Sequence, residues 1–234
     1  MKRLRELCKN INIQLDDTAL ERFEKYMDLV IEWNEKINLT AITDREEFIV
    51  KHFYDSITLL SCTEIPQDAK IIDVGTGAGF PGVPLKIVRP DIKLTLLDSL
   101  NKRIIFLNDV VMPCLNLSAE AIHGRAEDFS KLPEYREKYD FAVSRAVANL
   151  SALSEYCIPF VKHGGLFISM KGPQIQDELL AAKNAVETLG GEIVKVNNLV
   201  LPDNSGRSIV VVKKTKNTPA KYPRRGVKIN KNPL

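Results

Sequence analysis

The period of the hydrophobic positions changes along the chain, and this change separates a helical first part from a sheet-forming remainder. Between residues 1 and 62 apolar side chains recur at helical spacing, as they do at Leu20, Phe23, Met27, Val30 and Ile31. A helix is predicted after the capping run 16–18, and a second one over 45–60. From residue 69 onward short apolar runs alternate with helical patterns, which predicts a parallel sheet covered by helices on both faces.

The strands and helices of this second part can be placed from the same pattern. We expect strands near 70–74, 93–98, 119–123, 139–144 and 164–170, with helices near 81–88, 101–112, 149–160 and 173–189. The β-rich segments 192–201 and 207–213 flank the run Pro-Asp-Asn-Ser-Gly, which predicts an antiparallel hairpin at the end of the sheet.

A glycine-rich loop follows the first predicted strand. Four glycines fall within eight residues, directly after Asp73: Gly75, Gly77, Gly79 and Gly82. Glycine tolerates positive φ and has no Cβ, so a ligand can touch the main chain of such a loop. Formally, the last three glycines satisfy the dinucleotide fingerprint, with Asp98 as the ribose acid.

The position of Asp73 favours a different ligand. A carboxylate just before the glycines can accept a hydrogen bond from a cationic amino group, which S-adenosylmethionine carries, whereas it would repel a pyrophosphate. Asp98 ends the second strand at the carboxyl edge of the sheet, where its two oxygens suit the two ribose hydroxyls. The alternative reading is that Asp73 caps the loop and Asp98 caps the following helix.

Three further stretches are expected near the ligand. Ala126 and Glu127 follow the third strand, where adenine could be bound, although Glu127 could equally be a first-turn helix acid. Arg145 closes the fourth strand and faces the expected position of the donor methyl, with a surface salt bridge as its alternative. Asn38 lies between the two early helices, where either a helix-capping turn or a contact with substrate is possible. His52 and Asp55 are interpreted as a structural pair.

Composition narrows the class of protein. The chain has 234 residues, of which 44% are apolar, and it has no uninterrupted apolar stretch of 18 residues, so we expect a soluble, cytoplasmic protein. The four cysteines are far apart and there are three histidines, which predicts reduced thiols and no metal site. We divide the chain into a helical extension (1–65), a core (66–214) and a basic C-terminal tail (215–234).

The charge is unevenly distributed. Residues 204–234 carry nine Lys or Arg and no acid, which leaves 24 basic and 30 acidic residues in the remainder, a net charge of +9 against −6. This asymmetry indicates a polyanionic partner.

The predicted strands also indicate a fold class. Five strands linked by helices and closed by an antiparallel hairpin are typical of the Rossmann-like, seven-stranded, mostly parallel sheet of class I S-adenosylmethionine-dependent methyltransferases.

Several motifs together resemble one bacterial family, ribosomal RNA small-subunit methyltransferase G, also called glucose-inhibited division protein B. The resemblance covers nearly the whole chain and rests on the runs 33–40, 51–56, 73–82, 124–129, 144–146 and 222–225. It implies methyl transfer from S-adenosylmethionine to the 7-nitrogen of guanosine 527 in 16S ribosomal RNA. Free RNA or the small ribosomal subunit would be the partner of a chain that we expect to be monomeric.

The resemblance also implies roles for individual residues. Cofactor contacts would come from Gly75, Phe80, Asp98, Ser99, Leu100, Ala126, Glu127 and Arg145. Lys102, Arg125, Lys171 and Arg207 would lie on the RNA side, and we add the tail residues Lys221, Arg224 and Arg225 as phosphate contacts. Arg145, Asn38 and Lys171 are the candidates for positioning the reacting groups.

The 7-nitrogen of guanine has a free lone pair, so this reaction needs no general base. The sequence agrees, because no Asn-Pro-Pro-Tyr follows the fourth strand and no convincing nucleophilic cysteine is present. Two other classes stay open at this point: a nicotinamide-dependent oxidoreductase, for which no Tyr-x-x-x-Lys hydride site is found, and a non-catalytic RNA-binding module.

Overall fold

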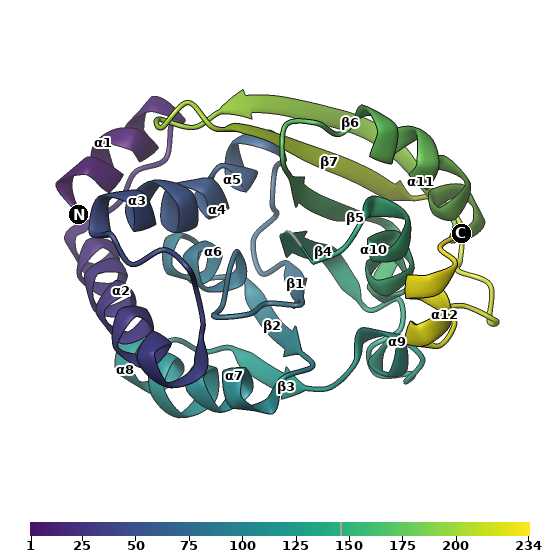
Figure 1. Cartoon of the computed structure of the whole chain (residues 1–234), viewed down its shortest axis with the longest axis horizontal. Coiled ribbons are helices and arrows are strands. Elements are labelled where there is room, and N and C mark those ends of the chain that lie inside the picture. The colour runs from purple at the N-terminus through teal and green to yellow at the C-terminus, as the bar shows by residue number, and fades with distance from the viewer. Residues whose placement is uncertain (146) are drawn as a thin grey trace.

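A seven-stranded sheet runs through the molecule in the order β3-β2-β1-β4-β5-β7-β6. The computed structural model describes residues 1–145 and 147–234. Five strands are parallel and the two at one end form an antiparallel hairpin (Figure 1). The strands are β1 (Lys70–Val74), β2 (Lys93–Asp98), β3 (Glu120–His123), β4 (Tyr139–Arg145), β5 (Val161–Lys171), β6 (Gly191–Val200) and β7 (Gly206–Lys214).

Successive side chains along a strand pack alternately into two hydrophobic cores, one on each face of the sheet. Ile71 belongs to the core that includes the N-terminal helices, whereas its neighbour Ile72 belongs to the core beneath α10 (Leu150–Cys157) and α11 (Gln176–Thr188). This follows from the two-residue period of a strand. Both faces of the central strands are covered, which explains why their sequences are continuously apolar.

Helices surround the sheet, and the first of them form an extension that packs on α6 (Gly82–Val88). This extension contains α1 (Lys2–Asn10), α2 (Asp17–Ile37) and a composite helix made of α3 (Arg45–Phe48), the π-helix η1 (Ile49–Tyr54), α4 (Asp55–Ile57) and α5 (Leu59–Cys62). The rest are α7 (Asn101–Ile105), the π-helix η2 (Phe106–Val111), α8 (Met112–Leu115), α9 (Ala126–Phe129), the 3₁₀ turn η3 (Ile158–Phe160) and α12 (Gly226–Lys231).

The predicted fold class is confirmed, and the structure refines the boundaries. The fifth strand begins at Val161, three residues before the expected start at 164, and Asp16 caps α2 as its side chain accepts from Ala19 N. The helices expected over 45–60 and 101–112 each contain a π segment. A π segment contains an inserted residue, which the hydrophobic periodicity of the sequence does not reveal. Short π segments within α-helices occur frequently at functional sites.

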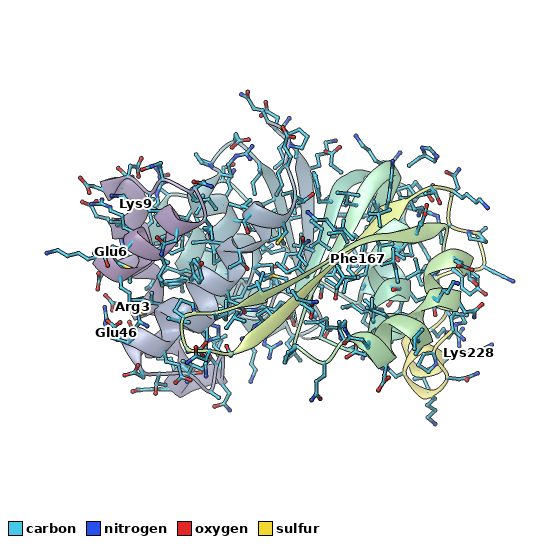
Figure 2. The ribbon with its side chains drawn as sticks, turned by 90° about the horizontal axis from the view of Figure 1, so that it is seen from above. Arg3, Glu6, Lys9, Glu46, Phe167 and Lys228 are labelled. Atoms are coloured by element: carbon cyan, nitrogen blue, oxygen red, sulfur yellow. The ribbon has the colours of Figure 1, made fainter. Side chains whose placement is uncertain are left out.

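The two ends of the chain lie at opposite ends of the molecule (Figure 1). Figure 2 shows Arg3 beside Glu46 within the N-terminal extension, where their side chains pair at 2.6 Å, and Lys228 of α12 at the other end. The residues after β7 are folded onto the core, with Tyr222 and Ile229 buried. The division of the chain at residues 65 and 214 stays a prediction.

None of the helices in the described part of the chain combines the length and the hydrophobicity that a membrane span requires.

Candidate cofactor and substrate site

The glycine loop after β1 is held in a left-handed backbone conformation. Gly75, Gly77 and Gly79 have φ values of +74°, +63° and +112°. A Cβ on Gly79 would come within 2.6 Å of both the Tyr26 hydroxyl and a Val83 methyl, while a Cβ on Gly77 would meet no described atom within 4 Å. At position 79 both the packing and the positive φ require glycine. At position 77 only the positive φ favours glycine, because the space beside the residue is open.

Asp73 serves as a cap of this loop. Its Oδ2 accepts hydrogen bonds from the Thr76 hydroxyl at 2.7 Å and from Gly82 N at 2.8 Å. The side chain is fully buried, and burial raises its pKa to about 6. Oδ1 is buried without a hydrogen-bond partner among the described residues. The structure therefore shows Asp73 as a cap of the loop, and its contact with an amino group of the cofactor stays a prediction.

Asp98 holds two backbone segments together, and its contact with ribose hydroxyls stays a prediction. Its Oδ1 accepts from Leu100 N and its Oδ2 from Gly77 N, both at 2.9 Å, so it ties the second strand to the glycine loop. Arg103 pairs with the same Oδ2 at 3.2 Å. The side chain also lines a cavity at the carboxyl edge of the sheet.

That cavity, which we call the first cavity, has a volume of about 220 Å³, and five of the predicted cofactor residues line it. Gly75, Asp98 and Ser99 form one side, and Gly124 to Glu127 form another. Tyr156 and Asn230 complete the lining, although no sequence argument had selected them. A nucleoside fits the chemistry of this lining, because it combines a carboxylate at the end of β2 with a glycine whose main chain no side chain covers.

A second cavity of about 660 Å³ adjoins the first, and the two share Val147 and Ala148 in their linings. Four cationic side chains, two carboxylates and His52 line the second cavity. The cations are Lys51, Arg145, Lys171 and Arg207, and the carboxylates are Asp55 and Glu178. A positively charged cavity beside a nucleoside-sized cavity suits a reaction in which a polyanionic substrate meets a nucleotide-like cofactor.

Arg145 has several hydrogen-bond partners in the wall of the second cavity. Its Nη1 donates to the Lys51 carbonyl at 3.0 Å and to Asp55 Oδ2 at 3.2 Å, and its Nη2 donates to His52 Nδ1 at 3.1 Å. The guanidinium carbon lies 5.1 Å from the centre of the Phe80 ring. Groups from the composite helix and the glycine loop therefore fix the orientation of this cation.

His52 is a neutral acceptor in this arrangement. An arginine can only donate, so His52 Nδ1 carries no proton and the ring proton is on Nε2, 2.7 Å from the Thr40 hydroxyl oxygen. Burial, and then the charge of Arg145, lower the pKa of His52 to about 3. The sequence had suggested a structural pair of His52 and Asp55; the structure instead joins both to Arg145.

Lys171 and Arg207 reach the second cavity from the adjacent antiparallel strands β5 and β7. Lys171 Nζ lies 2.7 Å from Glu178 Oε2 and donates to the Ala148 carbonyl. Arg207 Nε lies 3.1 Å from Asp55 Oδ1, so Asp55 pairs with two arginines through its two oxygens. The structure thus brings Arg145, Lys171 and Arg207 together.

Other predicted residues lie outside both cavities. Asn38 is the C-cap of α2 in a left-handed conformation with φ 49°, as its helix-capping alternative expects. It lines neither cavity, and its contact with substrate stays a prediction. Gly79 and Phe80 are buried behind the loop, and Leu100 is an exposed apolar side chain. Of the run 144–146, Ala146 lies outside the described residues.

The basic residues predicted to contact RNA outside the second cavity divide into two groups. Lys102, Lys221 and Arg225 are exposed, and Arg125 is exposed at the rim of the first cavity. Arg224 is different, since its guanidinium pairs with the fully buried carboxylate of Glu155 at 2.6 Å. Arg224 thus forms an internal ion pair, and its contact with a phosphate stays a prediction.

Comparison with solved structures identifies the fold. The methyltransferase bound to the Trm112 activator of Haloferax volcanii matches 80% of this chain and 97% of its own length, with a TM-score of 0.58 and 13% identity. Precorrin-6y C5,15-methyltransferase of Geobacter metallireducens matches 68% of this chain and 86% of its own, with a TM-score of 0.51 and 15% identity. The fold is that of a class I methyltransferase.

Sequence comparison identifies the family. The model of the family described as rRNA small subunit methyltransferase G matches residues 19–208. Relatives named ribosomal RNA small subunit methyltransferase G from Desulforamulus reducens and Alkaliphilus oremlandii are 51% and 50% identical over 99% of this chain and 97% of their own lengths. This chain belongs to that family. The cofactor of the family is S-adenosylmethionine, and the residues of the first cavity fit its nucleoside.

Proposed function

We propose that this protein transfers the methyl group of S-adenosylmethionine to the 7-nitrogen of guanosine 527 in 16S ribosomal RNA. The observation that carries this proposal is the pair of adjoining cavities, one lined by the glycine loop and Asp98 and the other by four cations. Membership of the rRNA small subunit methyltransferase G family supports the RNA substrate. We also propose that the protein acts as a monomer in the cytoplasm, where ribosomal subunits mature.

The first cavity holds the cofactor in this proposal. Gly75 offers backbone without a side chain, Asp98 lies where the ribose hydroxyls would be bound, and Ala126 with Glu127 lies at the adenine end. When bound, S-adenosylmethionine supplies an electrophilic methyl group on a sulfonium. Asp73 keeps the loop in shape from behind, through its hydrogen bonds with Thr76 and Gly82.

The second cavity receives the guanine. Its 7-nitrogen attacks through a lone pair, so no residue has to remove a proton. His52 is unsuited to that task in any case, because Arg145 and Thr40 use its two ring nitrogens. Alignment of the reacting atoms then supplies the rate enhancement, which can amount to about 7–11 kcal/mol for well-oriented groups.

Arg145 positions the base without blocking its nucleophile. A donor aimed at the 7-nitrogen would occupy the lone pair that must attack, so we assign Arg145 to oxygen-6 of guanine or to the cofactor. Lys171 and Arg207 line the same cavity and neutralise phosphates of the target loop. Further out, Lys102, Arg125, Lys221 and Arg225 provide exposed positive charge along the path of the RNA.

Methyl transfer to purified substrates tests this proposal. Small ribosomal subunits and protein-free 16S RNA from a bacterium lacking its own copy of the gene are incubated with the protein and S-adenosylmethionine, and the released nucleosides are analysed by mass spectrometry. We expect 7-methylguanosine, mapped to position 527 by cleavage at the methylated base. Methyl transfer to another atom or another nucleotide, or binding of RNA without methyl transfer, would refute it.

A further inference from the structure

The C-terminal segment 215–234 is built into the core. Arg136 donates to the carbonyls of Thr218 and Tyr222 at 2.8 and 2.9 Å, and Arg224 uses both its guanidinium and its backbone N–H to bind Glu155. Glu155 is fully buried in α10, so its carboxylate depends on this partner. These contacts hold α12 against α9 and α10, as Figure 1 shows at the C-terminal end.

The first residue of α12, Gly226, packs closely against Glu127, which lines the first cavity. A Cβ on Gly226 would lie 2.2 Å from Glu127 Oε1, so the start of the helix rests directly on the Glu127 side chain. One turn later Ile229 is buried, which fixes the rotation of the helix. The next residue, Asn230, lines the first cavity together with Glu127 and Tyr156.

Tyr156 orients the Asn230 side chain. The Tyr156 hydroxyl donates to Asn230 Oδ1 at 3.0 Å, and burial raises the pKa of Tyr156, so the hydroxyl keeps its proton. With Oδ1 accepting from the tyrosine, the Nδ2 amino group is the part of Asn230 that can donate to a ligand. A donor at Asn230 therefore lies beside an acceptor at Glu127.

This pair of groups matches one edge of adenine. Adenine presents an amino group, N6, beside an acceptor nitrogen, N1. Glu127 can accept from the amino group while Asn230 donates to the ring nitrogen. Hypoxanthine reverses both groups, because it carries an oxygen at position 6 and a hydrogen on N1, so the same two side chains would meet an acceptor with an acceptor and a donor with a donor.

We propose that Asn230, oriented by Tyr156, binds the adenine of the cofactor and makes α12 a specificity-determining wall of the cofactor site. This inference rests on the proposed function, since it assumes that S-adenosylmethionine occupies the first cavity. It assigns to the end of the chain a role in cofactor selection that differs from the RNA contact expected of a basic tail.

Calorimetric titration with S-adenosylhomocysteine and S-inosylhomocysteine tests the inference without measuring methyl transfer. We expect the wild type to bind the adenine compound at least roughly tenfold more tightly, and Asn230→Ala to lose most of this preference by weakening the adenine compound alone. Tyr156→Phe, which keeps the ring, should lose part of it. Asn232→Ala makes the same change just beyond α12, outside the residues that line the cavity, and should keep the wild-type preference.

The outcomes separate the inference from the proposed function. Unchanged affinity of Asn230→Ala for S-adenosylhomocysteine, or an equal loss for both compounds, would overturn the role of Asn230 while leaving the cofactor assignment intact. A wild type that binds neither compound would overturn the cofactor assignment itself, and the inference with it. Thermal unfolding of each variant verifies that the exposed substitutions leave the fold intact.

Discussion

The imidazole of His52 lies flat against the ring of Phe80, with 4.6 Å between the ring centroids and 9° between the ring planes. This contact joins the π-helical segment of the N-terminal extension to the glycine loop of the core. Arg145 approaches both rings, since it donates to His52 Nδ1 and lies over Phe80. The helical extension thus reaches into the site and sets the position of its central cation.

His52→Phe should impair methyl transfer while preserving the stacked ring. The substitution removes the acceptor for Arg145, and a hydrogen bond to a charged group contributes about 1.5–3 kcal/mol, so kcat/KM should fall roughly 10- to 100-fold. Affinity for S-adenosylmethionine should change little, because His52 lines the second cavity and not the first. Steady-state kinetics and calorimetry measure the two effects.

His52→Asn is the matched variant for this prediction. Its side-chain oxygen can take the place of Nδ1 as the acceptor for Arg145, while it lacks the ring that stacks on Phe80. We expect it to recover most of the activity that His52→Phe loses. If the phenylalanine variant proved the more active of the two, stacking and not the hydrogen bond would hold Arg145 in place.

The same histidine should make stability depend on pH. Its pKa is about 3 in the folded protein against an ordinary value of 6.5, so between these values the unfolded chain binds a proton that the folded protein does not. The free energy of unfolding should therefore fall as pH falls below 6.5, by about 1.4 kcal/mol per pH unit from this group. Above pH 6.5 the contribution is complete.

Urea unfolding at pH 7, 6 and 5 measures this dependence. His52→Asn should show a shallower fall than the wild type over this range, by up to one proton. His163→Asn is the control, since His163 is an exposed residue of β5 that contacts only the Thr215 carbonyl among the hydrogen bonds described. Equal slopes for the wild type and His52→Asn would contradict the buried, neutral state of His52.

The sequence predicted the sheet well because each strand has a local apolar pattern of its own. β1 and β2 occupy the expected ranges 70–74 and 93–98, and the acids at their ends lie at one edge of the sheet, as parallel strands require. What it did not predict depends on contacts between distant segments. Asp55 lies beside Arg145 and Arg207 across about 90 and 152 positions, and no local pattern encodes such a meeting.

The basic tail also contains a contact between distant residues that its sequence does not reveal. Charge alone made Arg224 and Arg225 equivalent, because a count of lysines and arginines does not reveal which of them meets a buried partner. The partner, Glu155, is 69 positions away in a helix whose pattern is largely apolar. An acid on the buried side of that helix is the signal that would have pointed to an internal ion pair.

Arg224→Ala should accordingly destabilise the protein far more than Arg225→Ala. The first leaves the buried Glu155 carboxylate unpaired and should destabilise the protein by about 3–5 kcal/mol. The second changes an exposed side chain and should leave stability within about 0.5 kcal/mol. Chemical unfolding of the two variants under identical conditions measures the difference, and Glu155→Gln combined with Arg224→Met should recover part of the loss.

Removal of exposed cations should weaken RNA binding in a salt-dependent way. Arg225→Ala and Lys221→Ala should each lower the slope of log affinity against log salt by about 0.7, the value for one single-strand phosphate contact. Glu127 and Asp98 are untouched by these changes, so affinity for S-adenosylmethionine should stay at the wild-type level. A slope that equals the wild type in both variants would remove these residues from the RNA path.

Gly77→Ala should separate the strain of the loop from its contact with cofactor. The residue has φ +63° with no described atom within 4 Å of an added Cβ, so substitution costs the left-handed strain, about 1–2 kcal/mol, and leaves the fold intact. Gly164 has φ +81° and equally open surroundings, but it belongs to β5 and lies outside the glycine loop, so Gly164→Ala should lose similar stability. Calorimetry with S-adenosylmethionine then distinguishes them: only Gly77→Ala should lose affinity, because its methyl group would occupy space where the loop backbone meets the ligand. Equal affinities in the two variants would place the cofactor away from Gly77.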